Sequence, residues 1–259
     1  MPQPVIIFLR YSLILKAAMA DCLEDPKPEV VHRLRSSNRR LEAVLELLTA
    51  SADLPALPKR SRAFKRSVQK TRRIAGDVRD LDVQLELLRA YQTSDGATKL
   101  EKELAVSRKK KVKKLLQQIS ADEDKIRHAL DRLEMIFAGI ADFKLSGGRL
   151  FHVARSWLTP AVQGLDPHED DDLHSIRKAC KTARYIAEIG GEESRTAMKF
   201  AKHMENIQQT TGAWHDYLLL LDQAQTRLPD GSRVIKKLYA KAALLRRQAE
   251  AKAAHLLRA

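Results

Sequence analysis

A stretch of the sequence near the start of the chain occurs a second time, 142 positions later. Val30–Leu48 reads VVHRLRSSNRRLEAVLELL, and Asp172–Gly190 reads DLHSIRKACKTARYIAEIG. Without a gap, this alignment pairs His32 with His174, Arg35 with Arg177, and Arg39 with Lys181. A chain that carries one pattern twice is expected to fold as two copies of one structural unit.

Both stretches are predicted to be amphipathic helices. At about 100° per residue, the leucines of the first copy share one stripe, and His32, Arg35 and Arg39 lie about 100–160° away from it. In the second copy the apolar stripe contains Ile176, Ala183 and Ala187. Each helix therefore carries an ordered cationic row at positions i, i+3 and i+7 on its polar face. Two such rows in one chain predict a single site with two sides.

A longer helical stretch is duplicated as well. The segment 64–88 aligns with 200–221 at an offset of 136. The alignment pairs Phe64 with Phe200, Arg66 with Lys202, Gly76 with Gly212, and Asp80 with Asp216. Arg66, Arg73 and Asp80 lie seven residues apart on one helical stripe. Lys202, Gln209 and Asp216 trace the same stripe in the second copy.

The composition favours an all-α fold. The chain has 259 residues with only 10 Gly and 9 Pro, and long runs of helix-forming residues separate its few turns. Paired glycines in Ser146–Arg149 mark the expected junction between an N-terminal helical bundle, residues 1–145, and a C-terminal one, residues 146–259. We expect two pseudo-symmetric antiparallel bundles with a basic groove or channel between them. Helices are expected over 5–22, 29–50, 61–91, 99–119, 122–144, 147–159, 172–190, 194–225 and 233–257.

The charge balance points to a polyanionic partner. A formal net charge of +14 attracts nucleic acid, a phosphate polymer or an anionic membrane. Aromatic residues make up only 5% of the chain, which leaves few stacking platforms for unpaired bases. The basic run 108–114 also has a core face, so its lysines are interpreted as solvated. The acidic run 169–172 is interpreted as helix capping rather than as a metal site.

Other features bound the cellular setting. The two cysteines, Cys22 and Cys180, form no disulfide scaffold, and Cys180 is expected to be buried, so a reducing, cytoplasmic compartment is predicted. No run approaches the ~18 apolar residues of a membrane span, and no membrane partner is expected. The apolar start of the chain is interrupted by Arg10 and Lys16 and is interpreted as a core helix rather than a signal peptide.

The strings VHRLRSSNRR, VRDLDV, LHSIRKACKTARY and WHDYL, in this order and at these separations, resemble the conserved-histidine α-helical domain, the CHAD family. The resemblance covers nearly the whole chain. It implies a pair of helical bundles related by a pseudo-two-fold axis, with a basic channel that binds inorganic polyphosphate. Members of the family also occur fused to triphosphate tunnel hydrolases and on polyphosphate granules, so granule association is an implied localisation.

The resemblance and the duplicated stripes together define the predicted polyphosphate-binding set, which has members in both repeats. These residues are His32, Arg35, Arg39, Arg66, Arg73, His174, Arg177, Lys178, Lys181, Arg184 and Lys202. Two positions depart from the family pattern. Glu42 stands where many members have a basic residue, which Arg184 keeps in the second copy, and His215-Asp216 replaces the usual Arg/Asn-Asp pair.

Phosphate chemistry explains why these residue types suit such a ligand. Arginine donates two parallel hydrogen bonds to one phosphate, and lysine supplies a mobile point charge. A polyanion favours protonated histidine, so mild acidification is expected to tighten binding at His32 and His174. Asp80 and Asp216 would repel the ligand. Either they hold a cationic side chain of their own half in place, or they form ordinary salt bridges between helices.

Three functions compete at this stage. A non-catalytic polyphosphate-binding module with no cofactor and no metal is the first, and a nucleic-acid binder is the second. The third is an enzyme, or an accessory subunit of an enzyme, acting on polyphosphate or triphosphate. Against catalysis, the E-x-E-x-K signature of tunnel hydrolases is incomplete at Glu101–Ala105, and there is no Walker-type loop. The sequence leaves the oligomeric state open.

Overall fold

The computed structural model describes residues 1–191 and 194–258. Within this part of the chain the secondary structure is entirely helical, which confirms the all-α prediction. The helices are α1 (Pro4–Glu24), α2 (Pro28–Ser51), α3 (Leu57–Leu88), α4 (Ala97–Ala138), α5 (Gly147–Val162), α6 (Asp170–Glu188), α7 (Arg195–Arg227) and α8 (Arg233–Arg258), with a short 3₁₀ helix η1 (Arg89–Tyr91).

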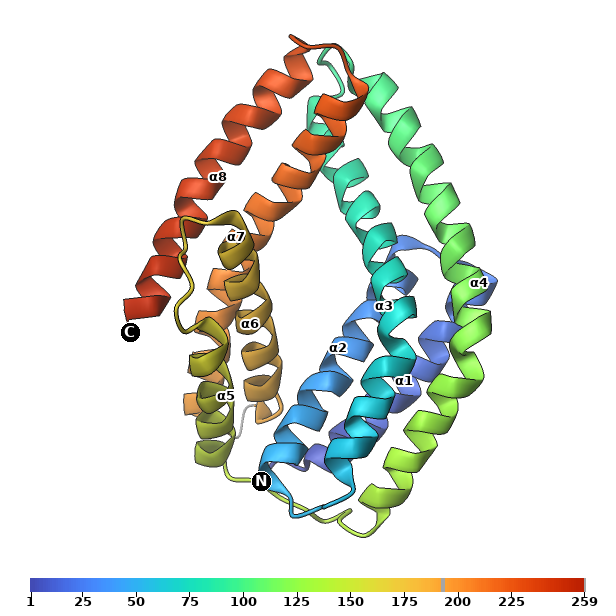
Figure 1. Ribbon diagram of the computed structural model, residues 1–259, viewed down its shortest axis with the longest axis vertical. Coiled ribbons are helices and arrows are strands. Elements are labelled where there is room, and N and C mark those ends of the chain that lie inside the picture. The colour runs from blue at the N-terminus through green and yellow to red at the C-terminus, as the bar shows by residue number, and fades with distance from the viewer. Residues whose placement is uncertain (192–193, 259) are drawn as a thin grey trace.

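Successive helices form antiparallel pairs, and the pairs repeat in the two halves (Figure 1). The helix α2 corresponds to α6, and the long α3 corresponds to the long α7. In Figure 1 the long pairs α3–α4 and α7–α8 form two arms that lean together and meet at the top of the view. The motif helices α2 and α6 lie between the arms, at the opposite end.

The predicted apolar stripes of the motif helices are buried. Leu41, Leu45 and Leu48 of α2 have no exposed surface, and neither have Ile176 and Ala183 of α6. Proline in the first turn of α2 and three acidic residues in the first turn of α6 are residues that favour a helix start at those points. The polar rows lie on the other side of each helix, and α2 and α6 pack against each other.

The main core crosses the predicted boundary at residues 145 and 146. One apolar cluster contains side chains of α1 to α5 and also the end of α6 and the start of α7. Phe8 packs edge-on against Phe137 at a centroid distance of 4.7 Å within the first half. Phe151 of α5 packs in the same way against Phe200 of α7 at 5.5 Å. The division into two bundles stays a prediction, because the halves share this core.

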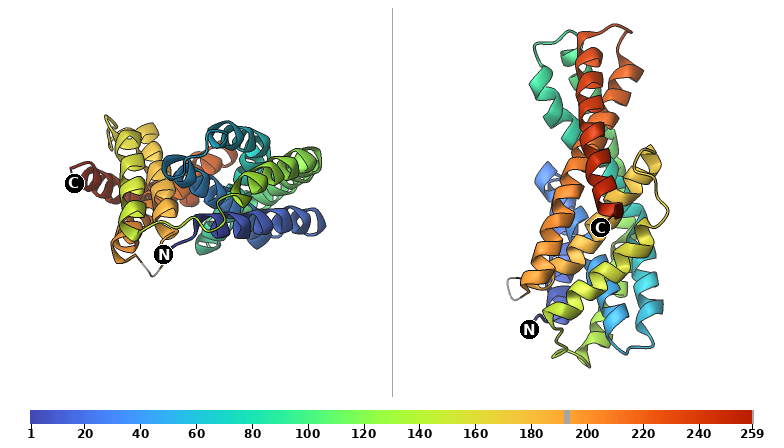
Figure 2. Two further views of the ribbon diagram at one scale, coloured as in Figure 1. Left: turned by 90° about the horizontal axis from the view of Figure 1, so that it is seen from below. Right: turned by 90° about the vertical axis from the view of Figure 1, so that its left-hand side faces the viewer.

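A separate contact joins the far ends of the two arms (Figure 2). Leu88 and Leu100 of the first arm share an apolar cluster with Leu220 and Leu238 of the second. The turns interlock above this cluster, where the Ser232 hydroxyl donates to the carbonyl oxygen of Asp95 over 3.0 Å. Gly96 lies in this turn with φ +86°, and a Cβ there would meet the Ser232 hydroxyl at 2.9 Å.

Two predicted helix ends are displaced by several residues, because α3 begins at Leu57 rather than at 61 and α4 ends at Ala138 rather than at 144. Two further predictions are wrong. The expected break near residue 121 does not exist, because α4 runs unbroken for 42 residues. Asp122, predicted to lie in the first turn of a new helix, is instead buried inside α4 and accepts hydrogen bonds from Thr71 and Gln118. The second error is the end of α5, which continues through Pro160 to Val162.

Candidate functional site between the halves

The motif helix α2 is fixed to the long helix α3 by an arginine. The Arg35 Nη1 atom donates to the carbonyl oxygen of Gly76 and to Asp80 Oδ1, each over 3.2 Å. A Cβ atom on residue 76 would lie only 3.2 Å from the same nitrogen. Glycine at this position therefore lets the guanidinium lie directly against the helix backbone, and does not interrupt the helix.

The second half repeats this arrangement with looser geometry. Arg177 of α6 lies over Gly212 of α7, where an added Cβ would be 3.4 Å from Nε. Arg177 Nη2 is 3.9 Å from Asp216 Oδ1, so the ion pair is longer than in the first half. Arg177 Nε is buried without a hydrogen-bond partner among the described residues. The Arg177 guanidinium thus keeps a free donor for a ligand.

The two arginine–aspartate pairs form one electrostatic centre. Burial lowers the pKa of Arg177, and so does the Arg35 guanidinium of the other half, while Asp216 and Asp80 oppose the change. Burial likewise raises the pKa of Asp216, which Arg177 lowers and Asp80 raises. Since each half acts on the ionisation of the other, the predicted rows meet across the interface between the halves.

Lys181 and Arg39 carry the least compensated charges of this centre. Burial lowers the pKa of Lys181 to about 7, and the nearby guanidinium of Arg39 contributes next. Burial also lowers the pKa of Arg39 to about 10, followed by the repulsion of Arg35. Neither side chain has a hydrogen-bond or ion-pair partner within the described ranges, and Arg39 Nε is buried. An anion placed between these two groups would relieve their repulsion.

Arg39 and Lys181 line a cavity of about 160 Å³ between the two halves. Its walls come from α2, α3, α5 and α6. Two of its other cations are already paired, since Lys65 contacts Glu46 and Arg72 contacts Glu42. The cavity therefore combines compensated ion pairs at its wall with two cations that lack a carboxylate partner.

A histidine pair borders the second half of the centre. The rings of His174 and His215 have a centroid distance of 4.6 Å, and both Nδ1 atoms are buried without a partner among the described residues. Burial lowers the pKa of His215 to about 4, with Arg177 as the next cause. Burial lowers the pKa of His174 as well, and Arg39 of the other half contributes to this change. Both rings are therefore neutral near pH 7.

His32 lies at the more exposed edge of the centre. Partial burial lowers its pKa, followed by the charges of Arg79 and of Lys181, which belongs to the other half. The pKa of His32 is thus affected by a cation of α6, as the pKa of His174 is affected by a cation of α2.

Five predicted residues lie outside this centre or are occupied by partners. Arg66, Arg73 and Lys178 are exposed. Lys202 is also exposed, at 79%, and is paired with Glu205. Arg184 is largely buried and is held by Glu188 over 2.6 Å and by Gln208 over 3.0 Å. Lys178 nevertheless lies close enough to act on the pKa of His174, and Arg184 close enough to act on that of Lys181. The role of all five side chains in binding stays a prediction.

Other residues join the centre although they were not predicted as ligands. Arg79 acts on His32 and on Asp216, and His215 occupies the equivalent position in the second repeat. Arg72 reaches the cavity, whereas its neighbour Arg73 was predicted. In the repeat alignment, residue 72 corresponds to 208 and residue 42 to 184. The pair Glu42–Arg72 of the first half therefore corresponds to the pair Arg184–Gln208 of the second, with the arginine on α3 in one half and on α6 in the other. The repeat alignment contains this signal.

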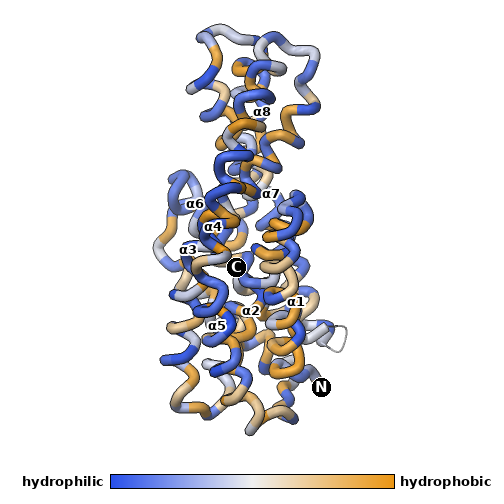
Figure 3. The backbone as a smooth tube through the Cα atoms, turned by 90° about the vertical axis from the view of Figure 1, so that its right-hand side faces the viewer, coloured by the Kyte–Doolittle hydropathy of each residue, from blue (hydrophilic) through white to orange (hydrophobic). Residues whose placement is uncertain are grey.

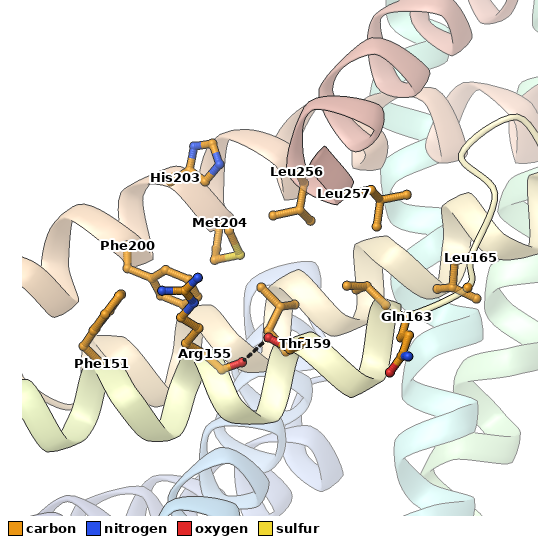
Figure 4. A pocket seen from close by; sticks show the side chains of 13 residues that line it. Phe151, Arg155, Thr159, Gln163, Leu165, Phe200, His203, Met204, Leu256 and Leu257 are labelled. Carbon is orange, nitrogen blue, oxygen red and sulfur yellow. Dashed lines mark hydrogen bonds between the residues drawn. The ribbon is translucent and has the colours of Figure 1, made fainter. Parts of the chain in front are cut away.

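A second cavity, of about 810 Å³, lies apart from these cations, between α5, α7 and the end of α8 (Figure 4). Its lining is mostly apolar and includes Phe151, Phe200, Met204 and Leu257. Arg155 reaches toward its rim in Figure 4. No group of three or more potential metal ligands occurs within the described residues. In the same part of the chain, no helix has the length and apolar character needed to cross a bilayer.

Comparisons with known proteins agree with the fold. The model of the CHAD domain family matches residues 14–225. The crystal structure of the CHAD domain from the plant Ricinus communis is similar, with a TM-score of 0.68 at 17% identity, over 96% of this chain and 89% of the other. PptA from Streptomyces chartreusis is similar with a TM-score of 0.63 at 16% identity, over 100% and 98% of the two chains. No curated protein matches the sequence.

Proposed function

The chain belongs to the CHAD domain family, and on this premise we propose that it binds inorganic polyphosphate between its two halves without hydrolysing it. The single observation that supports this proposal most is the convergence of Arg39 and Lys181 from opposite halves, where neither side chain forms an ion pair within the described residues. Burial of like charges costs free energy unless a counter-charge is supplied. A linear polyanion would supply it.

The arrangement suits a chain of phosphates better than a single anion. Asp80 pairs with Arg35 and Asp216 with Arg177, and Arg39 and Lys181 lie about one turn further along their helices. Donors spaced by four residues on a helix advance about 6 Å along its axis. A polymer with a charge on every unit can contact successive donors, whereas a single phosphate contacts one group of them.

Calorimetric titration with polyphosphates of several defined lengths tests the proposal. The key variant is Arg39→Gln/Lys181→Gln, and its matched control is Lys109→Gln/Lys110→Gln, which removes the same charge from exposed positions of α4. We expect the site variant to lose at least about tenfold in affinity, since each lost charge-assisted hydrogen bond contributes about 1.5–3 kcal/mol. Equal losses in the two folded variants would reject the site.

Nucleic acid is the alternative ligand, favoured by the net charge of +14. Competition between polyphosphate and duplex DNA or RNA at one fixed salt concentration separates the two ligands, because both bind more weakly as salt rises. We expect polyphosphate to displace the duplex at equal phosphate concentration. If the duplex displaces polyphosphate and polyphosphate does not displace the duplex, the protein is a nucleic-acid binder and the proposal is wrong.

The non-catalytic part of the proposal has its own test. Incubation with polyphosphate, with and without Mg²⁺, is expected to release no phosphate above the buffer control. Release that disappears in Arg39→Gln/Lys181→Gln would show that the site is catalytic. We also propose that the protein acts in the cytoplasm, on polyphosphate granules. Loss of a granule signal in cells that make no polyphosphate would support this placement.

A further inference from the structure

The apolar cavity between α5 and α7, the α5–α7 cavity, lies where the second half lacks a stretch of helix among the described residues. The helices α4 and α8 begin at equivalent positions, 97 and 233, but α4 has 42 residues and α8 has 26, which makes α8 shorter by about four turns. In Figure 1, α4 reaches the lower end of the molecule and α8 ends at mid-height. In the right-hand view of Figure 2, α5 continues below the end of α8. Leu256 and Leu257, at this end, border the cavity.

The wall of the cavity on α5 corresponds to a buried wall of α1. At an offset of 143, next to the offset of 142 between the motif helices, the segment 8–19 (FLRYSLILKAAM) aligns with 151–162 (FHVARSWLTPAV). Phe8 has no exposed surface, whereas the aligned Phe151 is only partly buried. The aligned phenylalanines of the long helices α3 and α7 differ in the same way. The second half therefore leaves partly open a surface that the first half covers.

The last turns of α4 cover this surface in the first half. Ile126, Leu130, Leu133 and Phe137 of α4 are buried at spacings of four, three and four residues, and Phe137 packs edge-on against Phe8. In Figure 3, viewed from the side of α4, hydrophobic residues recur between hydrophilic ones along the helices, as expected of amphipathic helices. The α5–α7 cavity is the corresponding place in the second half, without this cover.

The polar contacts at the edge of this surface show which charge a cover of the cavity needs. In the first half, the Ser12 hydroxyl donates to Glu134 of α4 over 2.6 Å, and Lys16 pairs with the same carboxylate over 3.2 Å. In the second half, Arg155 is aligned with Ser12, and its guanidinium forms no ion pair within the described residues. The cavity lining contains Arg155 and His203 and no carboxylate. An acidic side chain on the cover would therefore complement the charge of the lining.

We propose that the α5–α7 cavity binds an amphipathic helix of another protein, which takes the place that the last turns of α4 hold in the first half. Apolar side chains at positions i, i+4, i+7 and i+11 of this helix pack between α5 and α7, as those of α4 pack on α1 and α3. An acidic residue at i+8, the position of Glu134 in α4, pairs with Arg155. The cavity lies apart from Arg39 and Lys181, so this partner and polyphosphate bind at separate places.

Two observations favour a helix over a small apolar molecule as the occupant. The lining of the cavity extends along α5 from Phe151 to Val162, which is about three helical turns and matches the apolar face of a helix. In addition, the aligned pair α1 and α3 packs with a third helix in the same place. The fold therefore already contains one example of the contact that the second half offers to a partner.

A fluorescent peptide with the sequence of residues 121–140 tests the proposal, because it has the required spacing and carries Glu134. A hydrocarbon staple between positions 128 and 132, which are exposed in α4, keeps the peptide helical. Anisotropy titration with the full chain is expected to show saturable binding. Arg155→Glu is expected to weaken it at least about tenfold, because two carboxylates then face each other. Lys110→Glu, an equal change at an exposed position of α4, is the matched control and is expected to have no effect. A wild type that does not bind the peptide would overturn the proposal, and so would undiminished binding by Arg155→Glu.

A charge exchange tests the register, and a second variant separates this cavity from the polyphosphate site. A peptide with Glu134→Lys is expected to bind Arg155→Glu better than the wild type, because the ion pair is restored in the opposite direction. Arg39→Gln/Lys181→Gln is expected to bind the original peptide as the wild type does. Loss of peptide binding in that variant would mean that the acidic peptide occupies the polyphosphate site, and would contradict the proposal. Equal binding of both peptides by Arg155→Glu would contradict the pairing of i+8 with Arg155.

Discussion

The guanidinium of Arg35 lies against the backbone of α3 at Gly76, with Nη1 3.2 Å from the glycine carbonyl oxygen. Arg177 lies over Gly212 in the second half as well, without a hydrogen bond to the glycine carbonyl oxygen. A glycine inside a long helix costs helix stability. Glycine occurs at both equivalent positions because it leaves room for the arginine. Helix stability alone would favour another residue there.

Gly76→Ala is expected to change the free energy of unfolding little, because the gain in helix propensity is offset by the loss of the Arg35 hydrogen bonds, and to weaken polyphosphate binding about tenfold. Alanine favours a helix by about 1 kcal/mol over glycine, but its Cβ would displace the Arg35 guanidinium from its hydrogen bonds. Thermal melting and calorimetric titration measure the two effects. Gly148→Ala is the control, because nothing lies within 4 Å of a Cβ there. A variant that binds as well as the wild type would show that the position of Arg35 does not matter.

Polyphosphate affinity is expected to fall as pH rises through 7. The pKa of Lys181 is lowered to about 7 in the free protein, and a polyanion favours its charged form, so binding takes up a proton. The decrease is at most about tenfold per pH unit for one proton. Titrations in two buffers of different ionisation enthalpy measure the proton uptake. Uptake that persists unchanged in Lys181→Gln would assign it to other groups, among them His32 and His174.

The stability of the ligand-free protein is expected to rise with pH between about 7 and about 10. Lys181 has a pKa of about 7 in the folded chain, whereas an unfolded lysine titrates near ~10.4. The unfolded state therefore binds more protons in this interval, which favours it at the lower pH. Denaturant unfolding at several pH values measures the slope. Lys181→Met should flatten the curve, and an equally steep curve in that variant would exclude Lys181 as its origin.

Asp80→Ala is expected to weaken polyphosphate binding about two- to tenfold, and Asp216→Ala to weaken it less. Asp80 holds Arg35 at 3.2 Å, whereas Asp216 is 3.9 Å from Arg177, and ordering a free side chain costs about 0.5–1.5 kcal/mol. Calorimetry on both folded variants provides the comparison. Tighter binding by Asp80→Ala would mean that repulsion between carboxylate and phosphate outweighs the orienting effect.

Glu42→Gln is expected to tighten polyphosphate binding about two- to fivefold. The change releases Arg72 from its ion pair at the wall of the cavity, and a partly exposed pair of this kind contributes about 0.2–1 kcal/mol. Asp142→Asn, in the exposed turn after α4, removes an equal charge far from the cavity and serves as the control. If both variants gain equally, the effect comes from net charge and not from Arg72.

The sequence predicts the rows of the site better than it predicts their partners. The i, i+3, i+7 spacing of His32, Arg35 and Arg39 identifies one face of one helix, because helical geometry relates near neighbours in the chain. Which of Arg72 and Arg73 reaches the cavity depends on how α3 is rotated against α2, and no local pattern determines that rotation. The arginine–glycine contact has the same origin, since Gly76 is 41 residues away from Arg35.

The missed continuity of α4 has a different cause. The acidic residues after Ser120 have the composition of a helix start, which led to a predicted break there. In the structure Asp122 accepts hydrogen bonds from Thr71 on α3 and from Gln118 one turn earlier. A tertiary contact thus explains a residue that local capping rules assigned to a terminus.

The interlocked turns at Asp95 and Ser232 connect the two arms at the end away from α2 and α6. With both ends joined, the arms resemble the sides of a closed frame, and the spacing between the motif helices cannot widen without bending a long helix or separating the turns. The gap between α2 and α6 then keeps one width, whether or not a ligand is bound. Anions are then selected by whether they fit this gap. Because the gap exists before binding, the protein loses little conformational entropy when the ligand enters.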